Sequence, residues 1–413
     1  MRIYFDYAAT TPTDPRVKKA MLSYFSEKFG NTMSLHSFGQ EAKIALEESR
    51  KKVAKLMSAK PDEIIFTASA TESNNLALKG IALALAHREP QPKNQRSREF
   101  LTGFLSLREN KHIIISSIEH PCVMESANWL EKQGFQVTRI KVDKYGMVNP
   151  DDIERTIKKD TILVSIIHAS NEIGTIQPIE KIGEIIKKIN SSNTQHPIPK
   201  IYFHTDAAQS FGKIPIDVNK MNIDLLTASS HKMYGPKGAA CLFVKEGVKI
   251  ETIMHGGGQE NGLRSSTINV PAIVGFAKAC EICKKEMKKE GQRLTKLRDK
   301  LIKEVLKIKG AHLNGHPQKR LPNNANFSFD FIEGESLVIQ LDLAGIATST
   351  GSACSSMKLE PSHVLMAIGL RPEQAHGSLR ISLGRWTTEK EINYFLKVLP
   401  KIVKQLREIS PFK

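Results

Sequence analysis

Lys232 is the residue whose neighbours say most about chemistry. It ends the sequence Ser229-Ser230-His231-Lys232, which follows an apolar stretch at 223–228 and precedes a glycine- and proline-rich turn at 235–238. A lysine placed just past a strand and shielded from water has a lowered pKa, so it can act as a nucleophile and carry protons. Lys232 is therefore placed to form a Schiff base. Taken alone, the pattern is weak evidence, because most lysines near turns are solvated.

Asp206 is the second such residue, at the end of the apolar run that starts at Tyr202. Ligands bind at the carboxyl ends of strands in open α/β sheets. An acid there can pair with the ring nitrogen of a pyridine cofactor such as pyridoxal phosphate, which makes the ring an electron sink. The alternative is that Asp206 only caps a helix that follows it.

Two more segments place polar groups at the ends of expected strands. Ser69 and Glu72 have the spacing of a capping box, so a helix is expected to start here and to offer a phosphate site. His120 follows an apolar run at 113–115 and could stack on a flat cofactor. Each has an ordinary structural alternative, a capped helix for the first and a structural histidine for the second.

The elements that position these residues alternate along the chain from about 40 to 250. Helical periodicity at 41–57 and strand-like runs between the helices predict a mostly parallel sheet with helices on both sides. A long basic helix from about Val270 leads to a second unit with strands near 326–329 and 380–382. Polar insertions at 87–110 and 191–200 are read as tolerated surface loops. The strands expected in the first unit lie at 63–66, 113–116, 136–140, 161–167, 201–203 and 225–228.

Composition limits the class of protein. A chain of 413 residues can hold one large and one smaller domain. Its apolar runs fall far short of the ~18 residues of a membrane span, and its start lacks a signal-peptide pattern, which favours a cytoplasmic location. The net charge of +17 is spread over helical faces such as 284–290. No nucleic-acid-binding signature accompanies it, so we expect no direct contact with nucleic acid.

The five cysteines do not suggest a disulfide framework. Cys280 and Cys283 have metal or redox spacing, but they lie in one expected helix with no second cysteine or histidine pair nearby, so no metal is expected. Cys122 and Cys241 lie in apolar contexts and are expected to be packing residues.

In their order along the chain, the segments around Ser69, His120, Asp206 and Lys232 resemble the fold-type I pyridoxal-phosphate enzymes. The finer resemblance is to cysteine desulfurases of the NifS/IscS type, and it covers nearly the whole chain. It implies a large α/β domain at 16–265, with a mostly parallel seven-stranded sheet between helices and the insertion at 87–110. It also implies a smaller α+β domain formed by 1–15 and 266–413. Further matching motifs lie at 4–12, 168–174, 255–260, 264–267, 349–356 and 406–411.

The resemblance also implies roles for single residues toward pyridoxal phosphate. Lys232 would hold the cofactor, Asp206 would pair with its ring nitrogen, Gln209 would reach its phenolic oxygen, and His120 would stack on the ring and assist proton transfer. A threonine of the opposite subunit completes the phosphate site in this family, which implies a homodimer. The remaining cofactor-binding residues would be Ala70, Thr71, Asn171, Ser229, His231 and, from the opposite subunit, Thr267.

Cysteine desulfurases move sulfur from L-cysteine to an enzyme cysteine and release L-alanine. The match makes Cys354 the nucleophile, whose thiolate takes up the sulfur as a persulfide. Arg380 would bind the substrate carboxylate, with Asn171 and Asn31 as helpers. Arg385 is a nearby alternative that the residues alone do not exclude. Acceptors of the sulfur would be an iron–sulfur scaffold, a tRNA-thiolating enzyme, or both.

Some positions depart from the family pattern. Thr32 follows Asn31 where relatives often have proline, and Ser266 precedes Thr267 where they often have glycine. Gln259 and Asn261 stand where histidine and arginine are common. These departures leave open the fit of the substrate entrance and of the dimer edge.

Three alternatives remain. The first is a pyridoxal-phosphate lyase for selenocysteine or cysteine sulfinate on the same fold; Cys354 favours desulfuration, because those reactions can proceed without an enzyme thiol. The second is a metal-dependent hydrolase with zinc at His204, Asp206, His120 and His231. The third is a basic nucleic-acid-binding scaffold without catalysis, which the intact set of Lys232, Asp206, His120, Cys354 and Arg380 disfavours.

Overall fold

The computed structural model describes residues 2–86, 111–192, 200–351 and 361–410. The expected nucleophile, Cys354, and the insertion at 87–110 lie outside the described residues.

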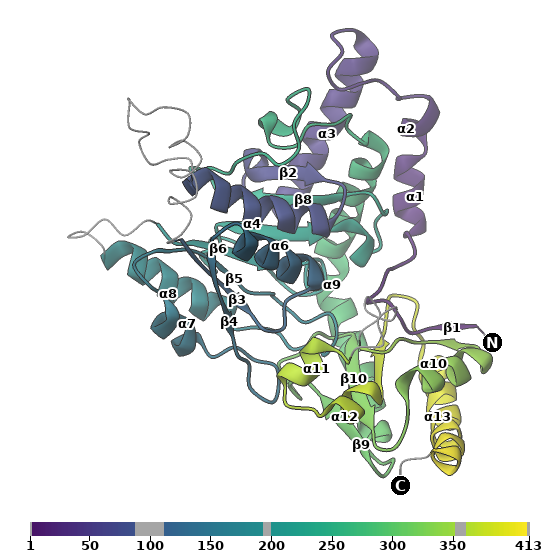
Figure 1. Cartoon of the computed structure of the whole chain (residues 1–413). Helices are drawn as coiled ribbons and strands as arrows, with labels where there is room; N and C mark the ends of the chain where they lie inside the picture. The colour runs from purple at the N-terminus through teal and green to yellow at the C-terminus, as the bar shows by residue number, and fades with distance from the viewer. Residues whose placement is uncertain (1, 87–110, 193–199, 352–360, 411–413) are drawn as a thin grey trace.

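A seven-stranded sheet forms the centre of the larger unit (Figure 1). Its strands run in the order β2-β8-β7-β6-β5-β3-β4, and all neighbours are parallel except the pairs that β8 makes with β2 and β7. The mostly parallel seven-stranded sheet is therefore confirmed, whereas β8 is missing from the strands expected above. The strands are β2 (Ile64–Thr67), β3 (His112–Ser116), β4 (Gln136–Ile140), β5 (Thr161–Ser165), β6 (Tyr202–Asp206), β7 (Leu225–Ser229) and β8 (Ala240–Val244).

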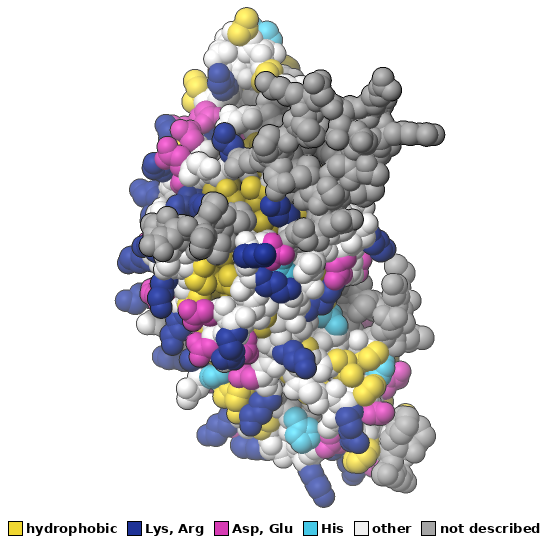
Figure 2. Space-filling view, turned by 60° about the vertical axis from the view of Figure 1, so that its left-hand side comes forward, with side chains coloured by type: hydrophobic (Ala, Val, Ile, Leu, Met, Phe, Trp, Pro, Cys, Tyr) yellow, Lys and Arg dark blue, Asp and Glu magenta, His cyan; other side chains and the backbone are white. Residues whose placement is uncertain are grey.

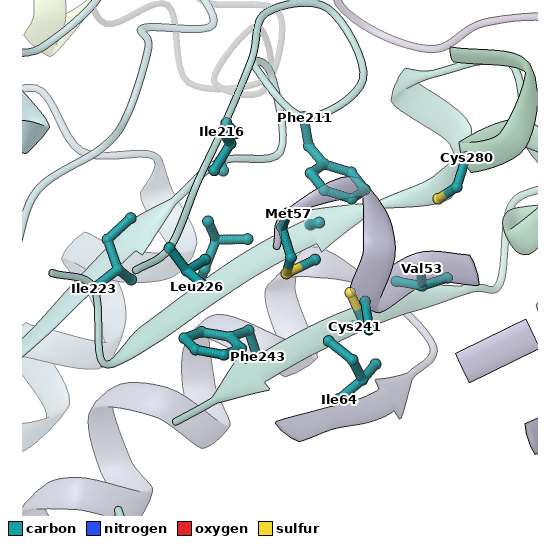
Figure 3. Close-up of a cluster of buried hydrophobic side chains, with 14 of the residues drawn as sticks. Val53, Met57, Ile64, Phe211, Ile216, Ile223, Leu226, Cys241, Phe243 and Cys280 are labelled. Atoms are coloured by element: carbon teal, nitrogen blue, oxygen red, sulfur yellow. The ribbon is translucent and has the colours of Figure 1, made fainter. Parts of the chain in front are cut away.

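Alternating side chains bury both faces of this sheet. Ile114 packs into one apolar cluster, whereas Ile113 and Ile115 pack into another on the opposite face. Helices α4 and α6 cover the second face, and α3, α7, α8 and the first half of α9 contribute to the first, part of which is shown in Figure 3. The helices of this unit are α1 (Pro15–Met21), α2 (Ser23–Ser26), α3 (Ser37–Leu56), α4 (Ala70–Ala86), α6 (Pro121–Lys132), α7 (Pro150–Thr156) and α8 (Ile179–Ser192).

Helix α9 (Val270–Val305) joins this unit to a smaller one. Its 36 residues extend about 54 Å, and its apolar side chains enter the large core up to Cys283 and the small core from Leu294 onward. The division of the chain into domains at 265 stays a prediction. The small unit contains β1 (Ile3–Tyr4), β9 (Ala311–Asn314), β10 (Asn324–Phe329), α10 (Gly334–Leu343), β11 (Ile346–Ala347), α11 (His363–Ala367), α12 (Pro372–His376), β12 (Ser378–Ser382) and α13 (Glu389–Ile409).

The N-terminal segment connects the two units. Phe5 N donates to Ala347 O (2.8 Å) in the small unit, and Thr11 N donates to His231 O (3.0 Å) beside β7. This segment therefore crosses the region where the strands of the large sheet end.

Lys and Arg side chains are spread over the face shown in Figure 2, with Asp and Glu side chains among them. Within the described ranges, the helices are too short or too polar to cross a membrane.

Candidate active site

A cavity of about 230 Å³ opens at the carboxyl ends of β3, β6 and β7, beside the start of α4. This is the edge at which open α/β sheets bind ligands. The cavity brings together most of the residues singled out from the sequence: Ala70, Thr71, His120, Asn171, Asp206, Gln209, His231, Lys232 and Arg380.

Lys232 ends a short 3-10 turn that follows β7. Its Nζ donates to two main-chain oxygens of the N-terminal segment, Ala8 O at 2.8 Å and Ala9 O at 2.7 Å. No sequence pattern predicts this arrangement, because the main-chain oxygens of alanines leave no signal in the side chains. The N-terminal segment thus fixes where the lysine amine lies in the cavity.

Asp206 is the last residue of β6 and is 4% exposed. Its carboxylate accepts from Asn74 Nδ2 at 2.7 Å and from Ala208 N at 2.9 Å. These two donors fix the orientation of the carboxylate at the cavity. Turns, not a helix, follow the strand, so the alternative of a helix cap for Asp206 is wrong.

His120 both caps α6 and lines the cavity. Its Nδ1 accepts from Cys122 N at 3.2 Å, and burial lowers its pKa, so the ring is neutral with its proton on Nε2. The Sγ of Cys122 lies 3.0 Å from His120 Nδ1 and 3.0 Å from Asn74 Nδ2. Cys122 is therefore more than the packing residue expected from its apolar neighbours in sequence, whereas Cys241 lies in the apolar core.

The start of α4 carries the expected cap in a modified form. Ser69 Oγ accepts from Glu72 N at 3.1 Å, but the Glu72 carboxylate accepts from Ala68 N instead of closing back on Ser69. His231 borders the same cavity, with its Nδ1 3.0 Å from Thr10 Oγ1. Burial lowers the pKa of His231 to about 4, so it is neutral.

Arg380 is 3% exposed and is held at the cavity by two contacts. Its Nη2 donates to Asp6 Oδ1 at 2.9 Å, and its Nη1 donates to Asn171 O at 3.1 Å. Its buried Nε has no hydrogen-bond partner among the described residues. A buried guanidinium with a spare donor is suited to a ligand carboxylate.

Arg385, the alternative to Arg380, does not line the cavity. It lies over the ring of Tyr234, 4.3 Å from the ring centroid, and pairs with Asp14 at 2.6 Å and Glu290 at 3.0 Å. Its charge is therefore already balanced within the protein.

Two buried acids beside the cavity were missed by the sequence reasoning. Glu119 accepts from Ser116 Oγ at 2.6 Å and from Ile167 N at 2.7 Å, and burial raises its pKa to about 8. Burial also raises the pKa of Glu172 to about 7. Nothing in the sequence separates these acids from exposed ones, because only the fold buries them.

The same two residues hold the chain that follows 352–360. Glu172 accepts from Ser362 Oγ, and the main-chain oxygen of Glu119 lies 2.9 Å from Nε2 of His363. His363 and Gly351 both line the cavity. The described residues on both sides of Cys354 therefore lie close to the cavity.

Three of the expected site residues do not line this cavity. Ser229 is buried at the end of β7. Thr267 is exposed and lines a separate cavity of about 230 Å³ that also includes Arg264. Asn31 is exposed in the loop before α3, where its Oδ1 accepts from Met33 N at 3.0 Å.

The zinc alternative does not match the geometry. His204 lies inside β6, where its ring contacts Ser165 Oγ at 2.8 Å and Thr227 Oγ1 at 3.3 Å, and it does not line the cavity. Across the described ranges, no three His, Cys, Asp or Glu side chains are grouped so that they could hold a metal ion.

The groups around the cavity fit pyridoxal phosphate. The amine of Lys232, the carboxylate of Asp206 and the imidazole of His120 line one cavity, and the start of α4 with its hydroxyl groups can accept a phosphate. The unpaired Nε of Arg380 offers an additional donor for an amino-acid carboxylate.

Comparison with known proteins shows the family to which the chain belongs. The family model described as "Aminotransferase class-V" matches residues 3–90 and 100–395. "Cysteine desulfurase IscS" of Dictyoglomus turgidum is 50% identical over 412 residues, which covers 100% of this chain and 97% of the relative.

Solved structures show the same similarity. A "NIFS-LIKE PROTEIN" aligns with a TM-score of 0.86 and 39% identity, over 98% of this chain and 100% of that one. The structure titled "SspA in complex with cysteine" aligns with a TM-score of 0.76 and 34% identity, over 94% of this chain and 100% of that one.

Proposed function

We propose how this chain, which belongs to the class-V aminotransferase family and is a cysteine desulfurase, carries out its reaction. The cavity around Lys232 binds both pyridoxal phosphate and L-cysteine. The observation that carries this proposal is the gathering of Lys232, Asp206, His120 and Arg380 around one cavity. Each of these groups has a separate task in the removal of sulfur from an amino acid.

When it is bound, the cofactor would supply an electron sink, and residues from several elements would hold it. Asp206 would pair with the ring nitrogen, and its hydrogen bonds from Asn74 and Ala208 hold the carboxylate in place for this contact. His120 would stack on the ring, and Gln209 would donate to the phenolic oxygen. The phosphate would be bound by Ala70 and Thr71 at the start of α4, with Ser229, His231 and Thr267 of the partner subunit, and Asn171 would also contact the cofactor.

Arg380 binds the carboxylate of L-cysteine, with Asn171 and Asn31 as helpers. Lys232 would act as the base that takes a proton from the substrate Cα. The thiolate of Cys354 attacks the substrate sulfur, so that a new S–S bond forms as the substrate C–S bond breaks. L-Alanine leaves, and Cys354 keeps the sulfur as a persulfide.

The protein acts as a homodimer in this proposal. Large apolar side chains between residues 22 and 44 are exposed, and Thr267 lies outside the cavity of its own subunit. A second copy would cover the apolar side chains and bring its Thr267 to the phosphate. The exposed apolar residues are Leu22, Phe25, Phe29, Met33, Leu35, Phe38 and Ile44.

The persulfide passes to an iron–sulfur scaffold, to a tRNA-thiolating enzyme, or to both. The name of the Dictyoglomus relative and the resemblance of the 349–356 motif support such acceptors. A cytoplasmic location stays a prediction.

Product analysis tests the proposal. Purified protein loaded with pyridoxal phosphate is given L-cysteine and a thiol reductant, and alanine and sulfide are measured. We expect equal amounts of both, and their joint loss in Cys354→Ser and in Lys232→Ala. Desulfuration of L-cysteine by Cys354→Ser at the native rate would contradict the mechanism and would favour a lyase for selenocysteine or cysteine sulfinate.

A further inference from the structure

Gln209 is held at both ends of its side-chain amide. Its Nε2 donates to Ala8 O at 2.9 Å, on the side of the cavity, and its Oε1 lies 3.4 Å from Lys213 Nζ. Lys213 Nζ also donates to the main-chain oxygen of Gln209 at 2.8 Å, which ties the lysine to this turn. We propose that Lys213 is a positioning residue, which fixes the amide of Gln209 with its N–H groups toward the cofactor.

The chemistry of the two side chains supports this role. An amide can be turned by 180° with little change in shape, so its partners decide which end faces which way. Lys213 Nζ carries N–H donors, and below its pKa of about 7 it is an ammonium group that can only donate, so the oxygen end of the amide is its suitable neighbour. The nitrogen end is left for Ala8 O and for one further acceptor.

Ala8 O alone holds the nitrogen end less firmly, because it also accepts from Lys232 Nζ at 2.8 Å. Without Lys213, Oε1 would lose a donor, and an unpaired buried oxygen is costly. The amide would then turn or shift, and an oxygen lone pair would replace an N–H group near an anionic ligand.

Lys213 has no contact with the main cavity. It borders a separate, much smaller one, together with Tyr234, Cys283, Glu290 and Arg385. Burial lowers its pKa to about 7, and the charge of Lys232 acts in the same direction. Burial of a lysine amine is unfavourable because the amine loses its contacts with water. The hydrogen bonds to Gln209 give a reason for a lysine at this position.

The inference rests on the proposed function, because the group that Gln209 would face is the phenolic oxygen of pyridoxal phosphate. An N–H donor there stabilises the anionic oxygen and weakens its hold on a proton. Loss of the donor should therefore raise the pH at which the visible absorption of the bound cofactor changes.

A pH titration of that absorption in four proteins tests the inference without a measurement of turnover. The proteins are the wild type, Lys213→Met, Gln209→Met and the double variant, each loaded with pyridoxal phosphate. We expect each single variant to raise the midpoint by about one pH unit, a tenfold change in proton affinity, and the double variant to go no further. Lys213→Arg, which keeps the donors, should titrate like the wild type, and so should Lys220→Met at an exposed position.

The outcomes separate three cases. A midpoint unchanged in Lys213→Met would overturn the inference. So would shifts that add in the double variant, because Lys213 would then act through its charge and not through Gln209. If Lys213→Met does not fold, Lys213→Gln, which shortens the donor, takes its place in the cycle. A wild-type protein that shows no cofactor absorption at all would overturn the proposed function as well.

Discussion

The floor of the cavity, where Asp206, His120 and Arg380 lie, and the exposed surface formed by residues 22–44 are not equally complete within one chain. On the floor, Asp206 and Arg380 are buried, and each has a hydrogen-bond partner from a distant part of the chain, whereas His120 accepts from Cys122 N at the start of its own helix. In the 22–44 segment, Leu35 is 92% exposed and Phe29 is 65% exposed. The chain satisfies its polar groups in one region and leaves apolar groups without cover in the other.

This difference suggests which parts of the site belong to a single subunit. Most of the expected residues that line the cavity follow strand ends or lie at the start of α4, whereas Arg380 lies within β12. Asn31 and Thr267, which do not line it, are both exposed. We infer that these two complete the site of a dimer, while the floor functions from within one chain.

Substitution of Asp206 should have the largest effect on the floor. Asp206→Asn removes the charge that would keep the ring nitrogen protonated, and we expect turnover to fall by about 10³-fold. Steady-state alanine release measures this. The matched control is Asp224→Asn, because Asp224 is equally buried and accepts from Phe203 N but lies away from the cavity. Equal losses in both variants would mean that the effect is structural.

Substitution of Arg380 should mainly affect substrate binding. Arg380→Lys keeps the charge but loses the paired donors, so we expect the KM for L-cysteine to rise by about 100-fold, or about 2.8 kcal/mol. Arg385→Lys should lower stability through its contacts with Asp14 and Glu290 and leave KM unchanged. A rise in KM for Arg385→Lys with none for Arg380→Lys would reverse their assignment.

A charge in the exposed apolar segment tests the second region. Leu35→Asp should weaken dimerisation at least about tenfold, because a carboxylate would have to be buried at the contact. Mass determination by light scattering over a dilution series measures the change. Ile339→Asp, at an exposed apolar position on α10, should leave the mass as in the wild type. A wild-type protein that is monomeric at every concentration would contradict the proposed homodimer.

The buried acid Glu119 predicts a smaller effect that depends on pH. Burial raises its pKa from the ordinary 4.5 to about 8, so the folded protein keeps this proton where the unfolded chain loses it. Its contribution to stability is therefore full below pH 4.5 and is lost as the pH rises toward 8. Glu119→Gln lacks this titrating group. The free energy of unfolding of the variant, relative to that of the wild type, should therefore rise by about 1–3 kcal/mol from pH 5.5 to pH 8. Denaturant unfolding of both proteins at pH 5.5 and at pH 8 measures this difference. Equal changes in the free energy of unfolding of the two proteins would contradict the raised pKa of Glu119.

The sequence predicted the sheet and many residues of the floor for a physical reason. Strand ends carry their polar residues in fixed positions, so Asp206 and Lys232 could be placed from the apolar runs before them. Contacts through the backbone leave no such pattern, which is why the hold of Ala8 and Ala9 on Lys232 was not foreseen. The burial of Glu119 and the polar contacts of Cys122 depend on tertiary packing, which also leaves no pattern in the sequence, so neither was predicted.

The most direct test asks which lysine holds the cofactor. Protein loaded with pyridoxal phosphate is reduced with borohydride, digested and mapped by mass spectrometry. We predict that the label lies on Lys232, which lines the main cavity. A label on Lys213, whose lowered pKa also makes it a reactive amine, or no label on either lysine, would contradict it.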